Sequence, residues 1–597
     1  MGSSGGPDGR RVVVIGAGPA GLTAARELAR LGVRPIVVEK TGGVGGLART
    51  ETFKGFHFDM GGHRFFTKVD EVNKIWHEVL GDDFRRRPRL SRIYYDRRFF
   101  YYPLRPLNTL LGLGPWQATL ILLSYLRWQL FPYRQKDTFE QWVTNRFGQR
   151  LFRIFFKTYT EKVWGIPCSE LRAEWAAQRI RNLSLKAAVL SMFLKPKRDI
   201  KTLIEEFDYP RLGPGMMWNA VAREIQQQGT VRLSCEVTAM RRTGLCVDGI
   251  VVSTGGREEF IPGTHFISSM PVTELVQKLS PPPPVPVLEA AGRLSYRDFL
   301  TVCLIVDRPH LFPDNWIYVH SPEVKVGRIQ NFKNWSPDMV PDPGKTSLGL
   351  EYFCTEGDAL WSLSDGELVE LGKRELERIG LARMADVEDG CVFRVPKAYP
   401  IYDADYRDCL ATVRQFVDSL QNLQSIGRNG LHRYDNQDHA MLTGLLAVRN
   451  LALGERNDLW SVNVDPEYHE EDAELPDRAL VAELEAGLGE VFHKLDGVAL
   501  GGAVGVAAGV LLCLTTLFLV LKGGDIVGPN LGLLAQYFPG YTVTWRGSLL
   551  GLAYGFASGF MAGWSFALLR NITLFLSMAI LHRRAQLRLL RRFLDFI

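Results

Sequence analysis

The chain has 597 residues and a formal net charge of +6 at pH 7, and 46% of its residues are hydrophobic. A chain of this length can form several domains, and so small a net charge argues against a nucleic-acid partner. Its eight cysteines include no CxxC pair, which argues against a zinc site and a disulfide framework and fits a reducing cytoplasm. We therefore expect no metal site.

A strand, a glycine turn and a helix open the chain. Residues 12–15 are apolar and β-branched, as in a buried parallel strand, and a GxGxxG sequence at 16–21 follows. Such glycines allow a tight turn and a close approach of the backbone to a pyrophosphate at the start of the helix. A second apolar run ends at Glu39, 18 residues after Gly21, where a carboxylate can accept hydrogen bonds from ribose hydroxyls. The pattern predicts a Rossmann-type nucleotide-binding domain, with a glycine turn that binds nothing as the alternative.

A second glycine cluster follows the first. Residues 42–46 (GGVGG) and 59–63 (DMGGH) would bring the backbone close to a large planar group, since glycine has no Cβ. Together with the first turn, this region resembles the FAD-binding amino-terminal region of the amine oxidase, protoporphyrinogen oxidase and UDP-galactopyranose mutase superfamily, which favours FAD over NAD. In this region the resemblance assigns to FAD binding Gly16, Gly18, Gly21, Glu39, Lys40, Gly45, Gly46, Arg49, Gly61 and Gly62.

Residues 91–206 are predicted to form a helical cap inserted into the nucleotide-binding domain. The alternation in SRIYYDRRFFYY predicts a hairpin with its turn at Asp96-Arg97. Residues 107–134 are largely helical, but their apolar core is too short and too interrupted for a membrane span. We expect this helix to be buried, with a membrane-grazing helix as the alternative. Residues 139–193 then look wholly helical.

The nucleotide-binding domain returns at 207–290, where the resemblance places Val237 against the adenine. Strands in 291–390 predict an antiparallel β substrate domain, and 391–465 complete the FAD-binding domain. In that last part a strand ends in glycines before a helix, so a helix amino terminus would face the flavin; a loop without a ligand is the alternative. The residues assigned to FAD here are Gly427, Arg428, Asn436, Gln437 and Asp438.

After a linker helix at 466–497, residues 498–597 are predicted to form a transmembrane hairpin and a basic tail. Residues 498–521 and 547–569 carry no charge, and each is long enough to cross ~30 Å of hydrocarbon. Small residues in both would let the two helices pack closely. The tail is expected to lie on anionic lipid as an amphipathic helix, with a third short span as the alternative.

The predicted fold class is α/β: a Rossmann-type FAD-binding domain with a helical insertion and an antiparallel β substrate domain, followed by a C-terminal transmembrane helical hairpin. The FAD-binding domain is assembled from 10–90, 207–290 and 391–465. Five arginines between 583 and 592 place the tail in the cytoplasm by the positive-inside rule, and two spans then place the flavin domain there too. We expect a multi-pass protein of the inner (cytoplasmic) membrane.

Three stretches resemble the UDP-galactopyranose mutases, particularly their eukaryotic branch: EKVWGIPCSELRAEWAAQRI, NWIYVHSPEVKVGRIQNFKNWSP and GRNGLHRYDNQDHAM. The resemblance implies that Arg179 and Arg328 bind the substrate's phosphates, and a guanidinium suits that task because it is always charged and planar. It also implies that His63 abuts the isoalloxazine. These three are the predicted catalytic residues, and the predicted substrate-binding residues are Tyr318, Tyr399, Tyr434 and Asn436.

No Ser/His/Asp arrangement or metal-ligand spacing is evident, so the reactive atom should belong to the cofactor. The resemblance implies that N5 of reduced FAD attacks C1 of the sugar and that galactopyranose and galactofuranose interconvert without net redox, with NAD(P)H as the reductant. The hairpin suggests a polyprenyl-phosphate carrier, as in the membrane-bound polyprenyl-phosphogalactose mutases, which the chain also resembles. UDP-galactose as substrate, an oxidase or desaturase of the protoporphyrinogen oxidase type and a non-catalytic scaffold are the alternatives. The expected partners are a lipid-linked or nucleotide sugar and membrane lipid, and a homodimer stays open.

Overall fold

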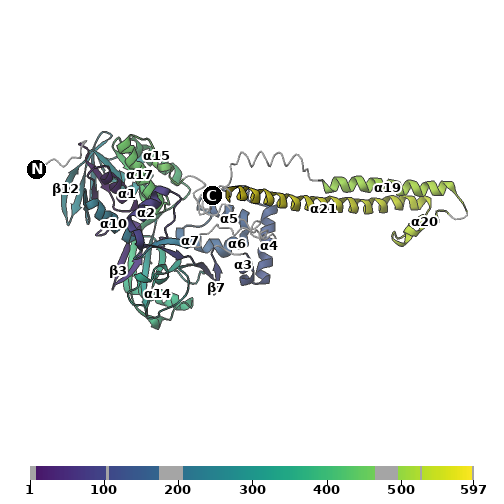
Figure 1. The fold of residues 1–597 in the computed structure, drawn as a ribbon, viewed down its shortest axis with the longest axis horizontal. Coiled ribbons are helices and arrows are strands. Elements are labelled where there is room, and N and C mark those ends of the chain that lie inside the picture. The colour runs from purple at the N-terminus through teal and green to yellow at the C-terminus, as the bar shows by residue number, and fades with distance from the viewer. Residues whose placement is uncertain (1–8, 103–105, 174–205, 464–494, 525–526, 595–597) are drawn as a thin grey trace. The chain divides into compact units, whose positions relative to one another are not determined.

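The computed structural model describes residues 9–102, 106–173, 206–463, 495–524 and 527–594. Within these ranges, the side chains beyond residue 571 and those of a few residues between 106 and 115 are not described. The chain divides into two compact units, Met1–Asp472 and Ala473–Ile597, which Figure 1 draws with the helices and strands labelled. Each unit is considered by itself below.

A five-stranded parallel sheet lies at the centre of the first unit and confirms the predicted Rossmann-type arrangement. Its order is β20-β13-β1-β2-β9, so its strands come from three distant parts of the chain. The strands are β1 (Val12–Ile15), β2 (Ile36–Val38), β9 (Thr230–Arg232), β13 (His265–Ser268) and β20 (Leu423–Ser425). Strand β1 is buried along its whole length, as expected for a central parallel strand that is covered on both faces.

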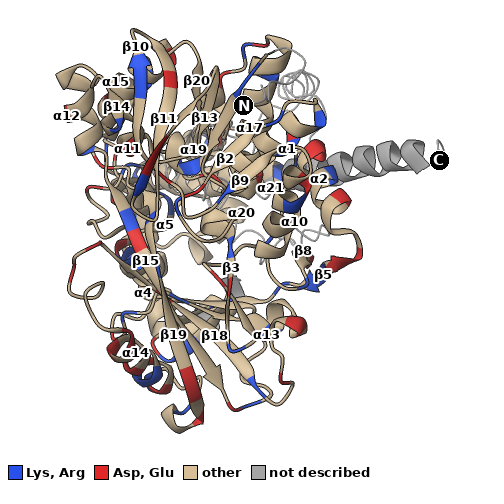
Figure 2. Ribbon diagram, turned by 90° about the vertical axis from the view of Figure 1, so that its left-hand side faces the viewer, with Lys and Arg blue, Asp and Glu red and all other residues tan. Residues whose placement is uncertain are grey.

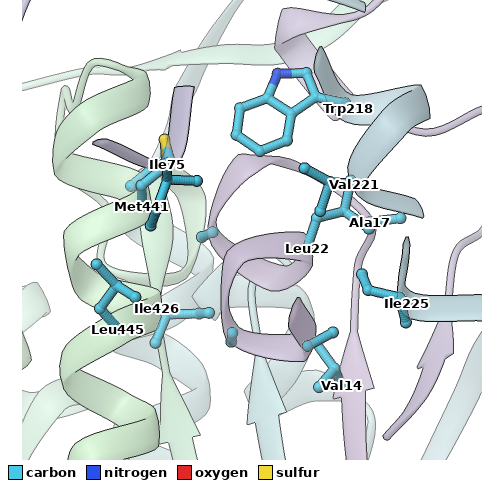
Figure 3. Close-up of a cluster of buried hydrophobic side chains, with 14 of the residues drawn as sticks. Val14, Ala17, Leu22, Ile75, Trp218, Val221, Ile225, Ile426, Met441 and Leu445 are labelled. Carbon is cyan, nitrogen blue, oxygen red and sulfur yellow. The ribbon is translucent and has the colours of Figure 1, made fainter. Parts of the chain in front are cut away.

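Three helices cover one core of this sheet. Helix α1 (Pro19–Arg30) packs between α10 (Gly215–Gln226) and α17 (Gln437–Leu453). Figure 3 shows Leu22 of α1 close to Trp218 and Val221 of α10, with Met441 and Leu445 of α17 on the other side. This packing holds together three segments that the sequence separates by up to four hundred residues.

Smaller elements surround this core. A four-stranded sheet runs in the order β12-β11-β10-β14, with β10 (Glu236–Thr243), β11 (Cys246–Thr254), β12 (Arg257–Pro262) and β14 (Leu279–Ser280). Two antiparallel pairs join β3 (Thr50–Phe53) to β4 (Phe56–Asp59), a hairpin, and β5 (Phe84–Pro88) to the sequence-distant β8 (Glu206–Pro210). The accompanying helices are α2 (Asp70–Leu80), α11 (Val272–Gln277), α12 (Val285–Arg293), α15 (Tyr406–Ser419) and α16 (Gly427–Gly430).

The predicted substrate domain is a seven-stranded sheet in the order β19-β15-β18-β17-β16-β6-β7. Its strands are β6 (Ser91–Tyr95), β7 (Arg98–Tyr101), β15 (Tyr296–Val306), β16 (Trp316–Val319), β17 (Arg328–Asn331), β18 (Thr346–Cys354) and β19 (Val387–Pro400). All neighbours are antiparallel except β6 and β16, which pair in parallel. Helices α13 (Phe332–Trp335) and α14 (Asp365–Arg378) accompany it.

The hairpin predicted at residues 91–102 is confirmed as β6 and β7. Asp96 and Arg97 both have positive φ, 48° and 58°, as a two-residue hairpin turn requires. The hairpin adds two strands to the substrate sheet instead of belonging to the helical cap. Its edge strand is short, and the helical insertion begins only after Tyr101.

In its described part, the helical insertion contains α3 (Pro106–Leu113), α4 (Pro115–Leu130), α5 (Phe139–Phe147), α6 (Gln149–Phe152) and α7 (Thr158–Trp164), with a π-helical turn at Arg153–Lys157. Helix α4 contacts α3, α5 and α6. The expectation that the helix in 107–134 is buried is wrong, because Leu123, Leu126 and Leu130 on α4 are exposed. The part of the predicted helical region from 174 to 193 lies outside the described residues.

The described residues of the second unit form a pair of long antiparallel helices, α19 (Gly497–Lys522) and α21 (Trp545–Leu594), with the short helix α20 (Pro529–Gly532) between them in sequence. By length and composition, α19 and the Trp545–Asn571 part of α21 could each cross a membrane. Helix α21 continues through Leu594 without a break, because the sequence from 570 to 594 contains neither glycine nor proline. The basic tail is thus one helix with the second span. The predicted linker helix at 466–497 falls almost entirely outside the described residues.

Glycines at every fourth position let these two helices touch. Gly501, Gly505 and Gly509 of α19 lie against Gly563, Gly559 and Gly555 of α21, respectively. A Cβ atom added at Gly505 would lie 2.7 Å from the carbonyl oxygen of Phe556, and one at Gly559 would lie 2.9 Å from the Cα of Gly505. Small residues at this spacing are the usual means of close helix packing in lipid.

We therefore expect Gly505→Val to force α19 and α21 apart and to destabilise the pair by roughly 1–3 kcal/mol. Gly502→Val is the matched control, because a Cβ at Gly502 meets nothing within 4 Å. A titration of the full chain from mild detergent into sodium dodecyl sulfate, followed by protease protection of the hairpin, measures the midpoint of unfolding. Equal midpoints for the two variants would contradict the packing described here.

Candidate functional site

Two glycine loops form a narrow cradle at the amino terminus of α1. Gly16 has φ +95°, and a Cβ there would lie 2.3 Å from the hydroxyl oxygen of Ser269. A Cβ at Gly21 would lie 2.0 Å from the carbonyl oxygen of Gly16, and one at Gly46 would lie 3.1 Å from the Cα of Gly18. The two predicted loops thus face each other over the start of α1, where free backbone N–H groups favour a pyrophosphate.

Glu39 lies buried at the end of β2, as predicted. Its carboxylate accepts hydrogen bonds from the backbone N–H of Ala17 (2.8 Å) and from the N–H and hydroxyl of Thr41 (2.9 and 2.8 Å). Its backbone carbonyl accepts from the N–H of Cys235 (2.8 Å), two residues before the buried Val237. Glu39 and Val237 therefore lie on the same side of the cradle, and their contacts with ribose and adenine stay predictions.

The flanking basic residues are placed differently. Lys40 is exposed, and Arg49 forms an ion pair with Glu51 at 2.6 Å. The Cα of Arg49 would lie 3.1 Å from a Cβ at Gly45, whose φ is +101°, so Arg49 lies next to the second glycine loop. The structure leaves their role in FAD binding a prediction.

A third loop completes the cradle from the far end of the chain. Gly427 has φ +74°, and a Cβ there would lie 2.9 Å from the Cβ of Ala20. Helix α17 begins nearby with Asn436 as its N-cap. The next side chain, Gln437, accepts a hydrogen bond from the indole N–H of Trp218 (3.1 Å), and Asp438 is buried. Three glycine loops and two helix amino termini thus meet in a shape that suits a dinucleotide.

Beyond the cradle, the sequence-predicted substrate residues come together. Tyr318 and Arg328 are cross-strand neighbours on β16 and β17. The guanidinium of Arg328 donates to the hydroxyl of Tyr399 (2.6 Å) and forms an ion pair with the buried Glu351. Tyr399 in turn stacks on Tyr434, with ring centroids 5.5 Å apart. Although burial alone would lower it, Glu351 holds the pKa of Arg328 above its ordinary value.

Arg428 belongs to this cluster more than to the cradle. Its guanidinium donates to the carbonyl oxygens of Asp435 (2.8 and 2.6 Å) and Ala398 (3.0 Å). The same group lies 4.8 Å from the centroid of the Tyr434 ring. These bonds fix the segment that carries Tyr434 and leads into Asn436. The predicted contact of Arg428 with the pyrophosphate stays a prediction.

His63 lies at the junction of cradle and cluster, in the loop that contains Gly61 and Gly62. Its Nε2 atom is 2.8 Å from the carbonyl oxygen of Met60. Burial, assisted by the charges of Arg428 and Arg328, lowers the pKa of His63 to about 4, although the hydrogen bond to Met60 raises it. The imidazole is therefore neutral near pH 7, so it can donate or accept a hydrogen bond there but carries no positive charge.

Two further arginines, which the sequence did not single out, lie beside this cluster. The guanidinium carbons of Arg64 and Arg89 are 5.8 and 5.7 Å from the ring centroid of Trp316. The three guanidinium nitrogens of Arg89 are buried and have no hydrogen-bond partner among the described residues. Burial raises the pKa of the adjacent Tyr318 to about 12, while Arg64 and Arg89 draw it down. A buried, unpaired guanidinium is costly, which marks this spot for an anion.

One predicted catalytic residue cannot be placed, because Arg179 lies outside the described residues. The arginine pair predicted from the sequence is therefore not established as a pair. Arg64 follows His63 directly, and Arg89 ends the run RRRPR. The sequence thus held one clue to these two arginines: Arg64 directly follows a predicted catalytic residue. Arg89 has no such neighbour.

The strand that leads into the His63 loop ends at the buried Asp59. Its buried carboxylate accepts hydrogen bonds from the hydroxyls of Tyr209 and Thr50, the latter at 2.7 Å. Burial raises the pKa of Asp59 to about 7, although these two bonds lower it. The strand that ends at Asp59 is thereby tied to β8 and to the start of the loop around Gly61.

This carboxyl predicts a pH dependence of stability. The folded chain keeps the proton of Asp59 up to about pH 7, whereas the unfolded chain releases it near ~4. Between these values the folded state binds more protons, so the free energy of unfolding falls as pH rises. Asp59→Asn removes this pH-dependent contribution to the free energy of unfolding. The melting temperature of the variant minus that of the wild type should rise by roughly 2–5 °C from pH 4.5 to 7.5, and a constant difference would contradict the assignment.

Comparison with known proteins adds to this geometry. The profile of flavin containing amine oxidoreductases matches residues 19–432. The solved structure of reduced UDP-galactopyranose mutase is 22% identical and aligns with a TM-score of 0.68 over 78% of this chain and 100% of that one. A candidate protoporphyrinogen oxidase from Exiguobacterium sp. is 17% identical and aligns with a TM-score of 0.57 over 75% of this chain and 99% of that one. An inactive all-trans-retinol 13,14-reductase of Danio rerio is 54% identical over 55 residues, which span 9% of each chain.

Proposed function

Because this chain belongs to the flavin containing amine oxidoreductase family and binds FAD, we propose that it is a flavin-dependent sugar mutase. It interconverts galactopyranose and galactofuranose on a polyprenyl-phosphate carrier, without net redox. The observation that carries the proposal is the unpaired guanidinium of Arg89 beside Trp316 and Tyr318, next to the arginine–tyrosine cluster. The mutase structure that aligns along its full length supports the same reading.

A bound flavin in its reduced form would supply the nucleophile for the anomeric carbon. The residues of the chain bind and orient the substrate's phosphate. The charge of Arg328 is already balanced by Glu351, so Arg328 orients the Tyr399 hydroxyl and contributes little net charge. Arg89 has no such partner and is better suited to stabilise negative charge that grows on a departing phosphate. The neutral imidazole of His63 would offer a hydrogen bond to the flavin without adding charge.

The lipid carrier is proposed from the second unit. Two helices that could each span a membrane would hold the enzyme where a polyprenyl phosphate resides, at the inner (cytoplasmic) membrane with the catalytic unit in the cytoplasm. UDP-galactose is the competing substrate. NAD(P)H is the proposed reductant, and a homodimer is compatible with the proposal. An oxidase of the protoporphyrinogen oxidase type is the second candidate, favoured by the family match and by the Exiguobacterium structure.

Turnover with reduced enzyme separates these functions. The full chain in detergent or nanodiscs, reduced with dithionite under anaerobic conditions, should convert polyprenyl-phosphate galactofuranose to galactopyranose many times per flavin. The oxidised enzyme should be inactive. An oxidase would instead consume one equivalent of oxygen per product. If the enzyme converts UDP-galactose but not the lipid-linked sugar, its substrate is the nucleotide sugar.

Arg89→Met tests the anion site. Loss of a charge-assisted phosphate contact should lower kcat/KM about 100-fold, or ~2.7 kcal/mol. Removal of an unpaired buried charge should at the same time raise the melting temperature of the ligand-free protein. Arg86→Met is the control, because the Arg86 side chain is 71% exposed, and kcat/KM should stay within about twofold of wild type. Unchanged activity of Arg89→Met with full FAD content would contradict the role of Arg89.

A further inference from the structure

Three polar side chains of helix α4 form hydrogen bonds with other residues of the first unit. The side-chain oxygen of Gln117 accepts two hydrogen bonds from the guanidinium of Arg150 (3.0 and 2.7 Å). The hydroxyl of Ser124 accepts from the backbone N–H of Arg150 (3.1 Å), and the amide of Gln129 donates to the carbonyl oxygen of Asn145 (2.9 Å). Helix α4 therefore contacts the rest of the first unit through these hydrogen bonds and through the buried Ile121, which packs in an apolar cluster.

The outer face of α4 is apolar instead. Leu123, Leu126 and Leu130 repeat at helical spacing on one side, and Trp116 and Phe131 extend the surface at the two ends. Leu130 and Phe131 are each 73% exposed, and Trp116 is 72% exposed. A contiguous apolar surface of this kind marks a site of contact with a membrane or another protein. We call these residues, with Leu122, the α4 outer face.

The surrounding sequence carries charge of one sign. From 97 to 136 there are six arginines and lysines and no aspartate or glutamate, and Asp96 and Asp137 bound this stretch. Arg127, Arg134 and Lys136 are exposed near the α4 outer face. In contrast, α14 of the same unit carries acidic and basic residues along its length (Figure 2). Basic residues around an exposed apolar helix face complement anionic lipid headgroups.

We propose that the α4 outer face is a docking surface for an anionic lipid bilayer, which it enters to the depth of the headgroup–acyl boundary. The basic stretch around it contacts the headgroups, and Trp116 lies at the interface, where tryptophan is favoured. The same chain carries two helices able to span a membrane by length and composition. The first unit then contacts the bilayer through its own surface, independently of the reaction proposed above.

Quenching by brominated lipids tests the contact. The full chain is reconstituted in nanodiscs of phosphatidylglycerol and phosphatidylcholine, with an environment-sensitive fluorescent amino acid introduced at Leu126. Brominated acyl chains should quench this probe at least twofold. A probe at Leu514, exposed on α19, is the positive control, and a probe at Leu245, exposed on the four-stranded-sheet side of the first unit, should remain unquenched. Replacement of phosphatidylglycerol by phosphatidylcholine should at least halve the quenching at Leu126.

Leu123→Glu combined with Leu130→Glu should reduce the quenching at Leu126 to the level at Leu245, whereas the matched change Leu233→Glu should leave it intact. Quenching at Leu514 without quenching at Leu126 would overturn the proposal. A second result would also overturn the proposal: brominated lipid does not quench the Leu126 probe, but the emission of the probe shifts to the blue as protein concentration rises. That result assigns the α4 outer face to contact with a second copy of the chain. FAD content and melting temperature of the double variant, both expected to equal wild type, exclude misfolding as the cause.

Discussion

The constraint on which the first unit depends is the close approach of three loops that only glycine permits. Gly46 approaches the backbone at Gly18, Gly427 approaches Ala20, and Gly16 lies against Ser269 at the end of the neighbouring strand. These contacts join the start of the chain to segments near residues 270 and 430. The parallel sheet and its core around Leu22 and Trp218 are built from the same three segments. The cofactor cradle and the stability of the unit therefore have one structural origin.

The electrostatics of the site follow a division between paired and unpaired charge. Arg328 bonds to Glu351 and Tyr399, and Arg428 bonds to main-chain carbonyls. One nitrogen of Arg328, Nε, has no hydrogen-bond partner among the described residues, whereas all three guanidinium nitrogens of Arg89 have none. Under the proposed function, Arg328 and Arg428 position tyrosines and Arg89 meets the anion, although all of them look alike in the sequence.

The sequence predicted local features well and distant ones poorly. Glycine turns, the hairpin at Asp96-Arg97 and the helix after the glycines of 427–430 depend on a few adjacent residues. The neighbourhood of Arg89 depends instead on Trp316, which is more than two hundred residues away, and no spacing rule reports such a meeting. Helix α4 departs from the prediction for a different reason. An apolar helix is expected to bury its apolar side chains in a core, but Leu123, Leu126 and Leu130 of α4 are exposed.

The unbroken length of α21 has a mechanical consequence. Fifty residues at about 1.5 Å each give a rod of ~75 Å, of which ~30 Å suffices to cross the hydrocarbon. With Trp545–Asn571, 27 residues long, as the span, about 35 Å of helix extend beyond the bilayer without a joint. Such a lever converts a change of tilt within the membrane of roughly 10° into a sideways swing of about 6 Å at its tip. A change in bilayer thickness that tilts α21 would thereby move any group in contact with the arginine-rich end of the helix.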